Sequence, residues 1–125
     1  MNIDLKATTP LFFYLMIFQF FFGNIGTNVF AQSYNKISTF STNEGLPSNH
    51  IYDIVEDNNG FLWIATNNGI ARFDGKYFYN YTVKNGLPSN DVLQVIKEKN
   101  GTIWVNCYNE VPSYFDEINN QFVSI

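Results

Sequence analysis

The residues that could do chemistry in this sequence are few and mostly isolated from one another. The chain has one histidine, His50, and one cysteine, Cys107. Nucleophilic catalysis needs a nucleophile beside a base, and a zinc site needs three or four closely spaced ligands. The sequence contains no such Cys/His cluster and no pair of carboxylates at a spacing suited to acid–base catalysis. We therefore predict that the chain is not an enzyme and binds no cofactor and no metal.

Three features deserve a second interpretation. His50 could serve as a general base, but its place beside turn residues favours an exposed loop side chain. Cys107 could be a reactive thiol or form an intermolecular bridge, but Thr66, 41 residues earlier, suggests a small packed side chain. Residues 57–60, Asp-Asn-Asn-Gly, are similar to a calcium loop. They lack the spaced ligands and the closing glutamate of such loops, so we predict a plain turn.

The composition excludes some partners and favours one fold class. The net charge is −4 and the basic residues form no run, which argues against nucleic acid and against a polybasic membrane-binding surface. Aromatic and β-branched residues are frequent and suit half-buried strands. Asn and Gly recur between them and suit tight turns. The balance predicts short strands joined by turns.

An internal repeat organises the chain after its first 40 residues. The sequence Gly-Leu-Pro-Ser-Asn at 45–49 recurs unchanged at 86–90, and Trp63 recurs as Trp104 at the same offset of 41 residues. One inserted residue then aligns Phe73 with Phe115. Helical solenoids of this period need amphipathic helices, which the frequent Pro, Gly and Asn exclude. A period near 41 with short strands is typical of β-propeller blades of four strands each.

This repeat predicts an all-β chain of about two four-stranded propeller blades, an incomplete propeller that cannot close by itself, after an N-terminal signal peptide. In the first repeat we expect strands at 51–55, 61–66, 70–73 and 77–82, with 45–49 and 86–90 as links between blades. The predicted organisation is a signal peptide at 1–31, the end strand of a preceding blade at 32–42, one repeat at 43–83 and a second, irregular repeat at 84–125.

The N-terminal segment has the three parts of a secretory signal. Lys6 precedes an apolar run of 12 residues at 11–22, which is shorter than the ~20 residues of a membrane-spanning helix. Val29 and Ala31 suit a cleavage site after Ala31. An uncleaved signal anchor is the alternative. Either interpretation predicts an exported, periplasmic chain.

The repeat motif supplies the residues that we expect to hold each blade together. Trp63 and Trp104 lie mid-strand between apolar neighbours, which predicts packing between blades, with a sugar-stacking platform as the alternative. Pro112 falls where the third strand of the second repeat should run, so we expect that strand to be distorted or at an edge. The structural motif comprises Gly45, Leu46, Pro47, Asn49, Gly60, Trp63, Gly69, Phe73, Asp74, Gly86, Leu87, Pro88, Asn90, Gly101, Trp104, Phe115 and Asp116.

The unit at residues 45–74 resembles the two-component regulator propeller repeat. It combines Gly-Leu-Pro-Ser-Asn, an apolar strand, Glu56-Asp57, Trp63-Ile64, Gly69-Ile70 and Phe73-Asp74. The resemblance extends over residues 40–125, although Glu110 stands in place of Gly69 in the second repeat. It implies the extracytoplasmic sensor region of a hybrid two-component sensor histidine kinase of the kind common in Bacteroidetes. It also implies further blades and, in the full-length protein, a glycan-derived or other small ligand.

Three functions are compatible with this sequence. The first is the N-terminal part of an extracytoplasmic ligand-sensing propeller of a signal-transduction receptor. The second is a truncated, inactive propeller remnant with a structural role, because repeat folds usually need at least three units. The third, and least favoured, is part of an exported propeller enzyme, which would need polar residues converging on a central channel.

Overall fold

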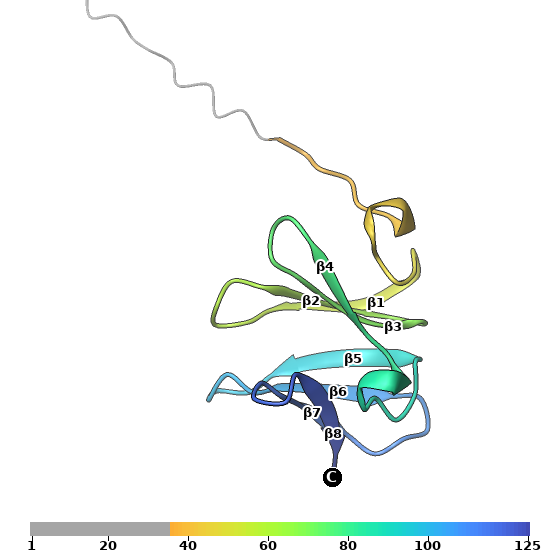
Figure 1. Cartoon of the computed structure of the whole chain (residues 1–125), viewed down its shortest axis with the longest axis vertical. Helices are drawn as coiled ribbons and strands as arrows, with labels where there is room; N and C mark the ends of the chain where they lie inside the picture. The colour runs from red at the N-terminus through yellow and green to blue at the C-terminus, as the bar shows by residue number, and fades with distance from the viewer. Residues whose placement is uncertain (1–35) are drawn as a thin grey trace, which may run out of the picture. The chain divides into compact units, whose positions relative to one another are not determined.

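The computed structural model describes residues 36–125, so the predicted signal peptide and its cleavage site at Ala31 lie outside the described residues. All strands of this part belong to two four-stranded antiparallel sheets (Figure 1). In residues 36–125, no helix is long and apolar enough to cross a membrane.

Each sheet is a simple meander that corresponds to one predicted repeat. Each strand pairs with the next along the chain, which gives the orders β1-β2-β3-β4 and β5-β6-β7-β8. The first sheet agrees with the predicted strands to within one residue at each end. The elements are η2 (Thr42–Glu44), β1 (Ile51–Glu56), β2 (Leu62–Thr66), β3 (Gly69–Phe73), β4 (Phe78–Tyr81), η3 (Val83–Asn85), β5 (Val92–Lys97), β6 (Ile103–Cys107), β7 (Ser113–Asp116) and β8 (Gln121–Ser124).

A 3-10 turn, η2 or η3, that the repeat did not predict directly precedes each link. The turn ends at a glycine in the left-handed region, Gly45 at φ 112° and Gly86 at φ 89°, where a side chain would be strained. The asparagine at the end of each link ties the turn back. The Oδ1 of Asn49 accepts the N–H of the first residue of η2 at 2.9 Å, and that of Asn90 does the same for η3 at 2.9 Å.

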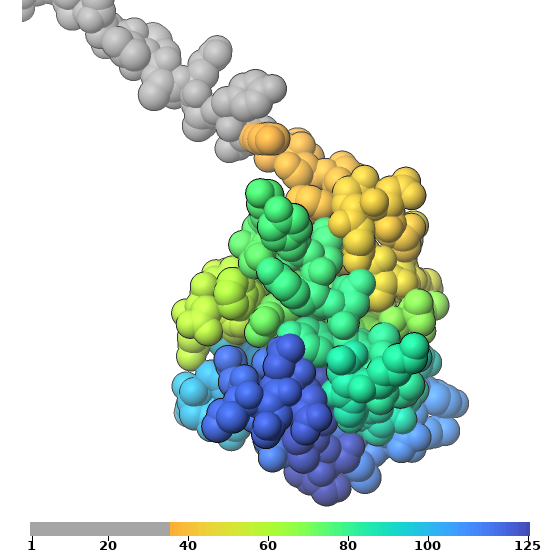
Figure 2. Space-filling view, in the orientation of Figure 1, coloured from red at the N-terminus to blue at the C-terminus, as the bar shows by residue number. Residues whose placement is uncertain are grey.

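The main apolar core lies between the two sheets. Trp63 and Val105 are fully buried there. The space-filling view shows the atoms of the two sheets in contact on the face that it presents (Figure 2). This core comprises Trp63, Ala65, Ile70, Tyr81, Leu87, Val92, Val95, Ile103, Val105, Cys107, Phe115 and Phe122. A smaller cluster of Leu46, Ile64, Ala71 and Phe73 lies apart from it. Because successive strand residues point to opposite faces, Trp63 and Ile64 serve different clusters.

One local expectation differs from the structure, and another is confirmed. The described part of the predicted end strand, residues 36–42, contains no strand, because a strand needs a pairing partner and none lies beside it. Pro112 does distort its strand: β7 starts only at Ser113 and pairs with β6 at two positions, whereas β2 and β3 pair at five. However, β7 is an interior strand and not an edge. The proline is accommodated just before the ladder begins, where its missing N–H is not needed.

Candidate functional site

Several polar side chains lie at the joint, by which we mean the region where the two sheets pack against each other around the main core. One of these is Asp57, in the turn between β1 and β2, whose side chain is 7% exposed. Its Oδ1 accepts the N–H groups of Asn59 at 2.8 Å and Phe61 at 3.0 Å, and its Oδ2 accepts the indole N–H of Trp63 at 2.8 Å. Both oxygens therefore serve the turn and the tryptophan. This donor set fits the predicted plain turn better than a calcium loop.

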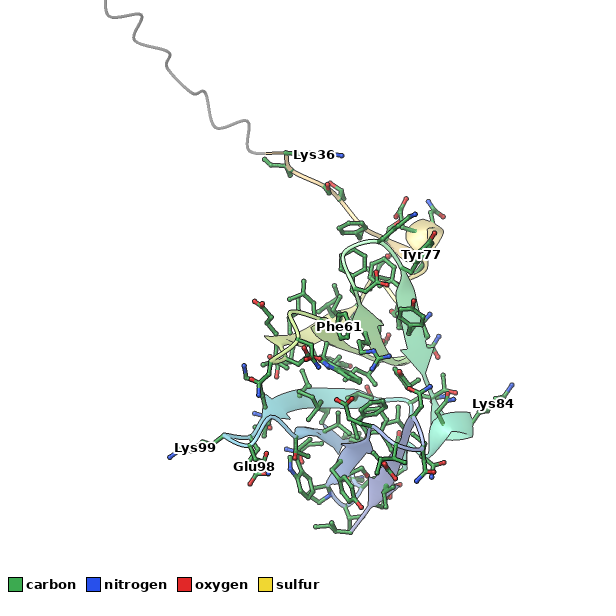
Figure 3. All side chains as sticks on the ribbon, turned by 60° about the vertical axis from the view of Figure 1, so that its left-hand side comes forward. Lys36, Phe61, Tyr77, Lys84, Glu98 and Lys99 are labelled. Atoms are coloured by element: carbon green, nitrogen blue, oxygen red, sulfur yellow. The ribbon has the colours of Figure 1, made fainter. Side chains whose placement is uncertain are left out.

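The second sheet contains an equivalent but longer hydrogen bond between a turn carboxylate and a tryptophan. The side chain of Glu98 accepts the indole N–H of Trp104 at 3.1 Å, six residues further along, as Asp57 does for Trp63. Glu98 and its neighbour Lys99 lie in the exposed turn between β5 and β6 (Figure 3). Trp63 is fully buried, which excludes a sugar-stacking role for it in this structure, whereas Trp104 is only half-buried. The difference arises because a neighbouring sheet covers only Trp63.

A single arginine is embedded in the aromatic residues of the joint. The guanidinium carbon of Arg72 lies 5.3 Å from the ring centroid of Phe61, 5.6 Å from that of Trp63 and 5.6 Å from that of Phe115. Phe61 and Trp63 belong to the first repeat and Phe115 to the second. Ring faces attract a cation electrostatically, and more strongly where water is excluded. Arg72 therefore contributes to holding the sheets together.

Among the described residues, two hydrogen bonds made by side chains cross the joint. The carboxylate of Asp53 accepts the N–H of Val95 at 3.0 Å, and the hydroxyl of Tyr81 donates to the Oδ1 of Asn120 at 2.8 Å. Val95 lies on β5, an edge strand of the second sheet, just after a register shift between Val92 and Gln94. Burial, the largest cause, raises the pKa of Tyr81, so its hydroxyl stays protonated and able to donate.

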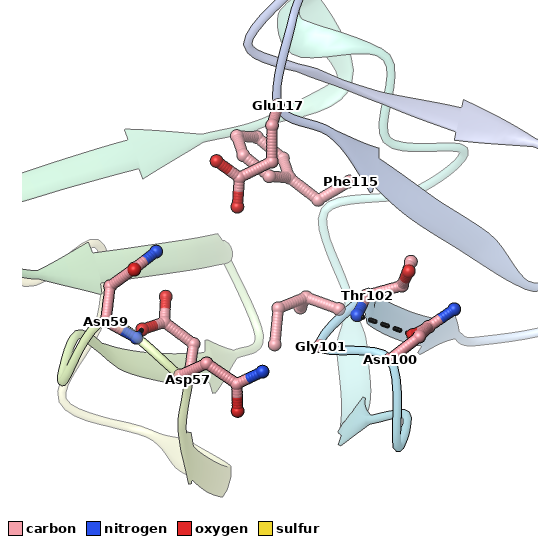
Figure 4. Close-up of a pocket in the computed structure, with 9 residues that line it drawn as sticks. Asp57, Asn59, Asn100, Gly101, Thr102, Phe115 and Glu117 are labelled. Carbon is pink, nitrogen blue, oxygen red and sulfur yellow. Dashed lines mark hydrogen bonds between the residues drawn. The ribbon is translucent and has the colours of Figure 1, made fainter.

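A polar cavity of about 250 Å³ opens at one end of the joint (Figure 4). Three turns meet around it: residues 57–59, residues 100–102 and the end of β7 with Glu117. In the close-up, the carboxylates of Asp57 and Glu117 and the amide of Asn59 face the cavity. Carboxylates, amides and a hydroxyl in such a cavity can hydrogen-bond a small polar ligand, and the two acids disfavour an anion. Its volume lies just below the usual range for small-molecule sites, ~300–1,000 Å³.

The isolated candidates lie elsewhere. His50 is exposed, with its ring centroid 5.0 Å from that of Tyr52, at the rim of a shallow polar hollow. Cys107 is 5% exposed within the main core, as expected of a small packed side chain. Burial raises the pKa of its thiol, which makes it a poor nucleophile. Within residues 36–125, no three His, Cys, Asp or Glu side chains are grouped to hold a metal ion.

The motif residues singled out from the sequence do not gather into one site. They are distributed over the links, turns and strands of both sheets. Asp74 and Asp116 close equivalent turns: each Oδ1 accepts two backbone N–H groups, at 2.7 and 2.8 Å for Asp74 and at 3.0 and 3.3 Å for Asp116. Hydrogen bonds to these carboxylates lower the pKa of both, by backbone amides first for Asp74 and by the Asn119 side chain first for Asp116.

Sequence reasoning missed the residues that join the sheets. Arg72, Asp53 and Asn120 stand at positions that the two repeats do not share, so the repeat comparison passed over them. Arg72 could have been noticed, because it is the one arginine of the chain and lies inside an apolar strand. The hydrogen bond between Asp53 and Val95 joins residues 42 positions apart, which no sequence pattern revealed.

Comparison with known proteins adds to this geometry. Residues 45–68 match the family described as two component regulator propeller. One solved structure, described as the extracellular domain of the hybrid two component system BT4673 from B. thetaiotaomicron, is 28% identical, with a TM-score of 0.57. The match covers 62% of this chain and 12% of that chain. Another structure of the extracellular domain of BT4673, there described as a one component system, is 22% identical, with a TM-score of 0.59. This second match covers 72% of this chain and 12% of that chain, and it supports the fold alone.

The chain thus spans 12% of the length of each of these two solved structures. No curated protein matches it. The predicted fold class of about two propeller blades is confirmed by the two sheets and by these neighbours. The resemblance recognised in the repeat is confirmed as well, because the matched segment runs from the first glycine of the link to the turn after β2. The chain thus contains a segment, residues 45–68, that matches the two component regulator propeller family.

Proposed function

We propose that this chain is part of the extracytoplasmic ligand-sensing propeller of a two-component signal-transduction receptor, located in the periplasm. The observation that carries the proposal is the family match at residues 45–68, in a chain whose two sheets have the same four-stranded order. The 28% identity with the extracellular domain of a hybrid two component system supports the same assignment. The sheets form the scaffold, and the joint between them offers a place for a ligand.

The polar cavity at the joint indicates the kind of ligand that this part could contact. Glu117 lines it from the second sheet and Asp57 from the first, so a ligand seated there would contact both blades. A ligand that prefers one arrangement of the blades shifts the population toward that arrangement. A small hydroxylated molecule, such as a glycan-derived one, has donors and acceptors that suit carboxylates and amides. Further blades are the other partners that we propose.

The size and location of the native product test the proposal. An antibody raised against residues 40–81 would be used to probe membrane and soluble fractions of the source cells. A receptor gives a large band in the membrane fraction, far above the 14.4 kDa of this chain. A band at or below 14.4 kDa in the soluble fraction would refute the receptor assignment and favour an inactive remnant. Protease treatment of spheroplasts adds the sidedness, because a periplasmic epitope is digested without lysis.

A further inference from the structure

The guanidinium of Arg72 is enclosed by aromatic rings, but its own hydrogen-bond donors are unoccupied. Besides the three rings described above, those of Tyr79 and Tyr81 lie 5.6 and 6.0 Å from the guanidinium carbon. Within residues 36–125 the guanidinium makes neither a hydrogen bond nor an ion pair, and none of its nitrogens is a fully buried atom without a partner. The N–H groups therefore reach solvent. They form a planar fork of donors that fits a carboxylate with two parallel hydrogen bonds.

This cation is specific to the joint and is not part of the fold that the two sheets share. Arg72 pairs with Trp63 across β2 and β3, and Tyr114 pairs with Trp104 in the same way across β6 and β7. An aromatic ring thus serves the second sheet where the first has a cation. The rings around Arg72 come from both sheets, so its surroundings are complete in this chain. An arginine that the shared fold does not require is a candidate for recognising a ligand.

The ring of Phe115 connects Arg72 to the polar cavity of the joint. This side chain lines the cavity, and its ring centroid lies 5.6 Å from the guanidinium carbon. In the close-up, Glu117 lies beside Phe115 (Figure 4). The cavity is therefore lined by carboxylates and amides, and a cation with free donors lies on the other side of one ring. A ligand that contacts both places needs hydroxyl groups at one end and an anionic group at the other.

We propose that the joint binds a sugar acid, whose carboxylate pairs with Arg72 while its hydroxyl groups lie in the polar cavity. The rings fix the guanidinium in advance, so little side-chain entropy is lost when the pair forms. Tyr79, which is 46% exposed, offers a ring face to the C–H groups of the sugar. The reverse orientation is disfavoured, because the carboxylate would then face Asp57 and Glu117. The inference rests on the proposed ligand-sensing function, but its failure leaves the receptor assignment standing, since the size and location of the native product test that separately.

The sequence makes a site-specific test possible, because Arg72 is the one arginine of the chain. In proton–nitrogen correlation spectra of the isotope-labelled full chain, the single arginine Nε–H signal reports on this site alone. Titration with glucuronate should shift that signal saturably, with a Kd on the order of 1 mM. The indole signal of Trp63 should move with it, because its ring lies 5.6 Å from the guanidinium carbon, and that of Trp104 should stay in place. Glucose, which lacks the carboxylate, should leave the arginine signal unchanged.

Two variants separate pairing with Arg72 from a general effect of charge. Arg72→Lys keeps the charge but loses the planar fork, so the affinity for glucuronate, measured on the Trp63 indole signal, should fall about tenfold. Lys84→Gln is the matched control, because it removes a positive charge from an exposed side chain of η3 and should bind as the unmodified chain does.

Four results would overturn the proposal. The first is an arginine signal that does not move with glucuronate, and the second is one that glucose shifts equally. The third is acetate binding as tightly as glucuronate, because the hydroxyl groups would then contribute nothing. The fourth is an Arg72→Lys variant with unchanged affinity, because the carboxylate would then not pair with the fork.

Discussion

The buried carboxylate of Asp57 allows a quantitative test of the joint. Asp57→Ala removes the acceptor of three hydrogen bonds, two from turn amides and one from the fully buried indole of Trp63. The indole N–H then has no partner and no water, at a cost of about 1–3 kcal/mol. The two amides lie at a turn where water can reach them, so each adds about 0.5–1 kcal/mol. We expect a loss of about 3 kcal/mol in the free energy of unfolding.

The repeat provides the matched control for this substitution. Glu98→Ala removes the equivalent acceptor, but Glu98 is exposed and binds only the half-buried Trp104. Water can replace it, so the loss should be less than roughly a third of that for Asp57→Ala. Asp57→Asn should fall between the two, because one oxygen remains for the turn while the amide group faces the indole N–H.

Urea unfolding followed by tryptophan fluorescence measures all three variants. The transitions should be recorded at two low protein concentrations, so that a midpoint shift from self-association is detected. Equal losses for Asp57→Ala and Glu98→Ala would refute the reasoning, because burial would then not decide the strength of the bond. A loss below about 1 kcal/mol for Asp57→Ala would mean that the indole finds another acceptor.

Three further substitutions or measurements probe the rest of the fold. Gly69→Ala should lower the free energy of unfolding by about 3 kcal/mol or more, because the φ of Gly69 is 104° and a Cβ would meet the Tyr81 carbonyl. Gly75→Ala, at φ 99° with open space around it, should lower it by about 1 kcal/mol. Urea unfolding measures both. Arg72→Ala should lower the free energy of unfolding by about 1–2 kcal/mol in the same assay, because it removes the cation from the ring faces. Arg72→Lys should restore part of this loss, because it keeps a cation there. Burial raises the pKa of the Cys107 thiol and keeps it protonated. At pH 8 it should therefore react with a disulfide reagent roughly 100-fold more slowly in the folded chain than in urea. Equal rates would contradict its place in the core.

The strands were predictable from the sequence because each repeat has turn-forming residues between its apolar runs. Glycine and asparagine mark the turns, and the apolar runs between them fix the strands of the first sheet to within a residue. The second sheet was less accessible because Pro112 gave two possible outcomes, and only the ladder shows that the chain keeps β7 inside the sheet. The 3-10 turns were missed because three residues are too few for a periodic pattern.

The joint was less predictable than the sheets, for a physical reason. Its contacts link residues about 40 positions apart, such as Asp53 with Val95 and Tyr81 with Asn120. A repeat reveals which residues are alike in both units, but a joint is made between unlike surfaces of adjacent units. The burial of Trp63 was correctly expected, whereas the half-burial of Trp104 depends on what covers its face.

Residues that are identical in both repeats reflect the fold of a blade, whereas residues that differ between the repeats reflect the contacts of each blade. Agreement at Gly45 and Gly86 reflects a left-handed turn in both links, and agreement at Trp63 and Trp104 reflects an indole N–H that donates to a turn carboxylate in each sheet. Function cannot be encoded in what all blades share, because shared residues cannot distinguish one joint from the next. The differing positions carry that information, and Arg72, opposite Phe115, is the clearest example, since Tyr114 takes its place in the second sheet. Substitutions that exchange differing residues between the sheets will therefore be more informative about binding than substitutions of the motif itself.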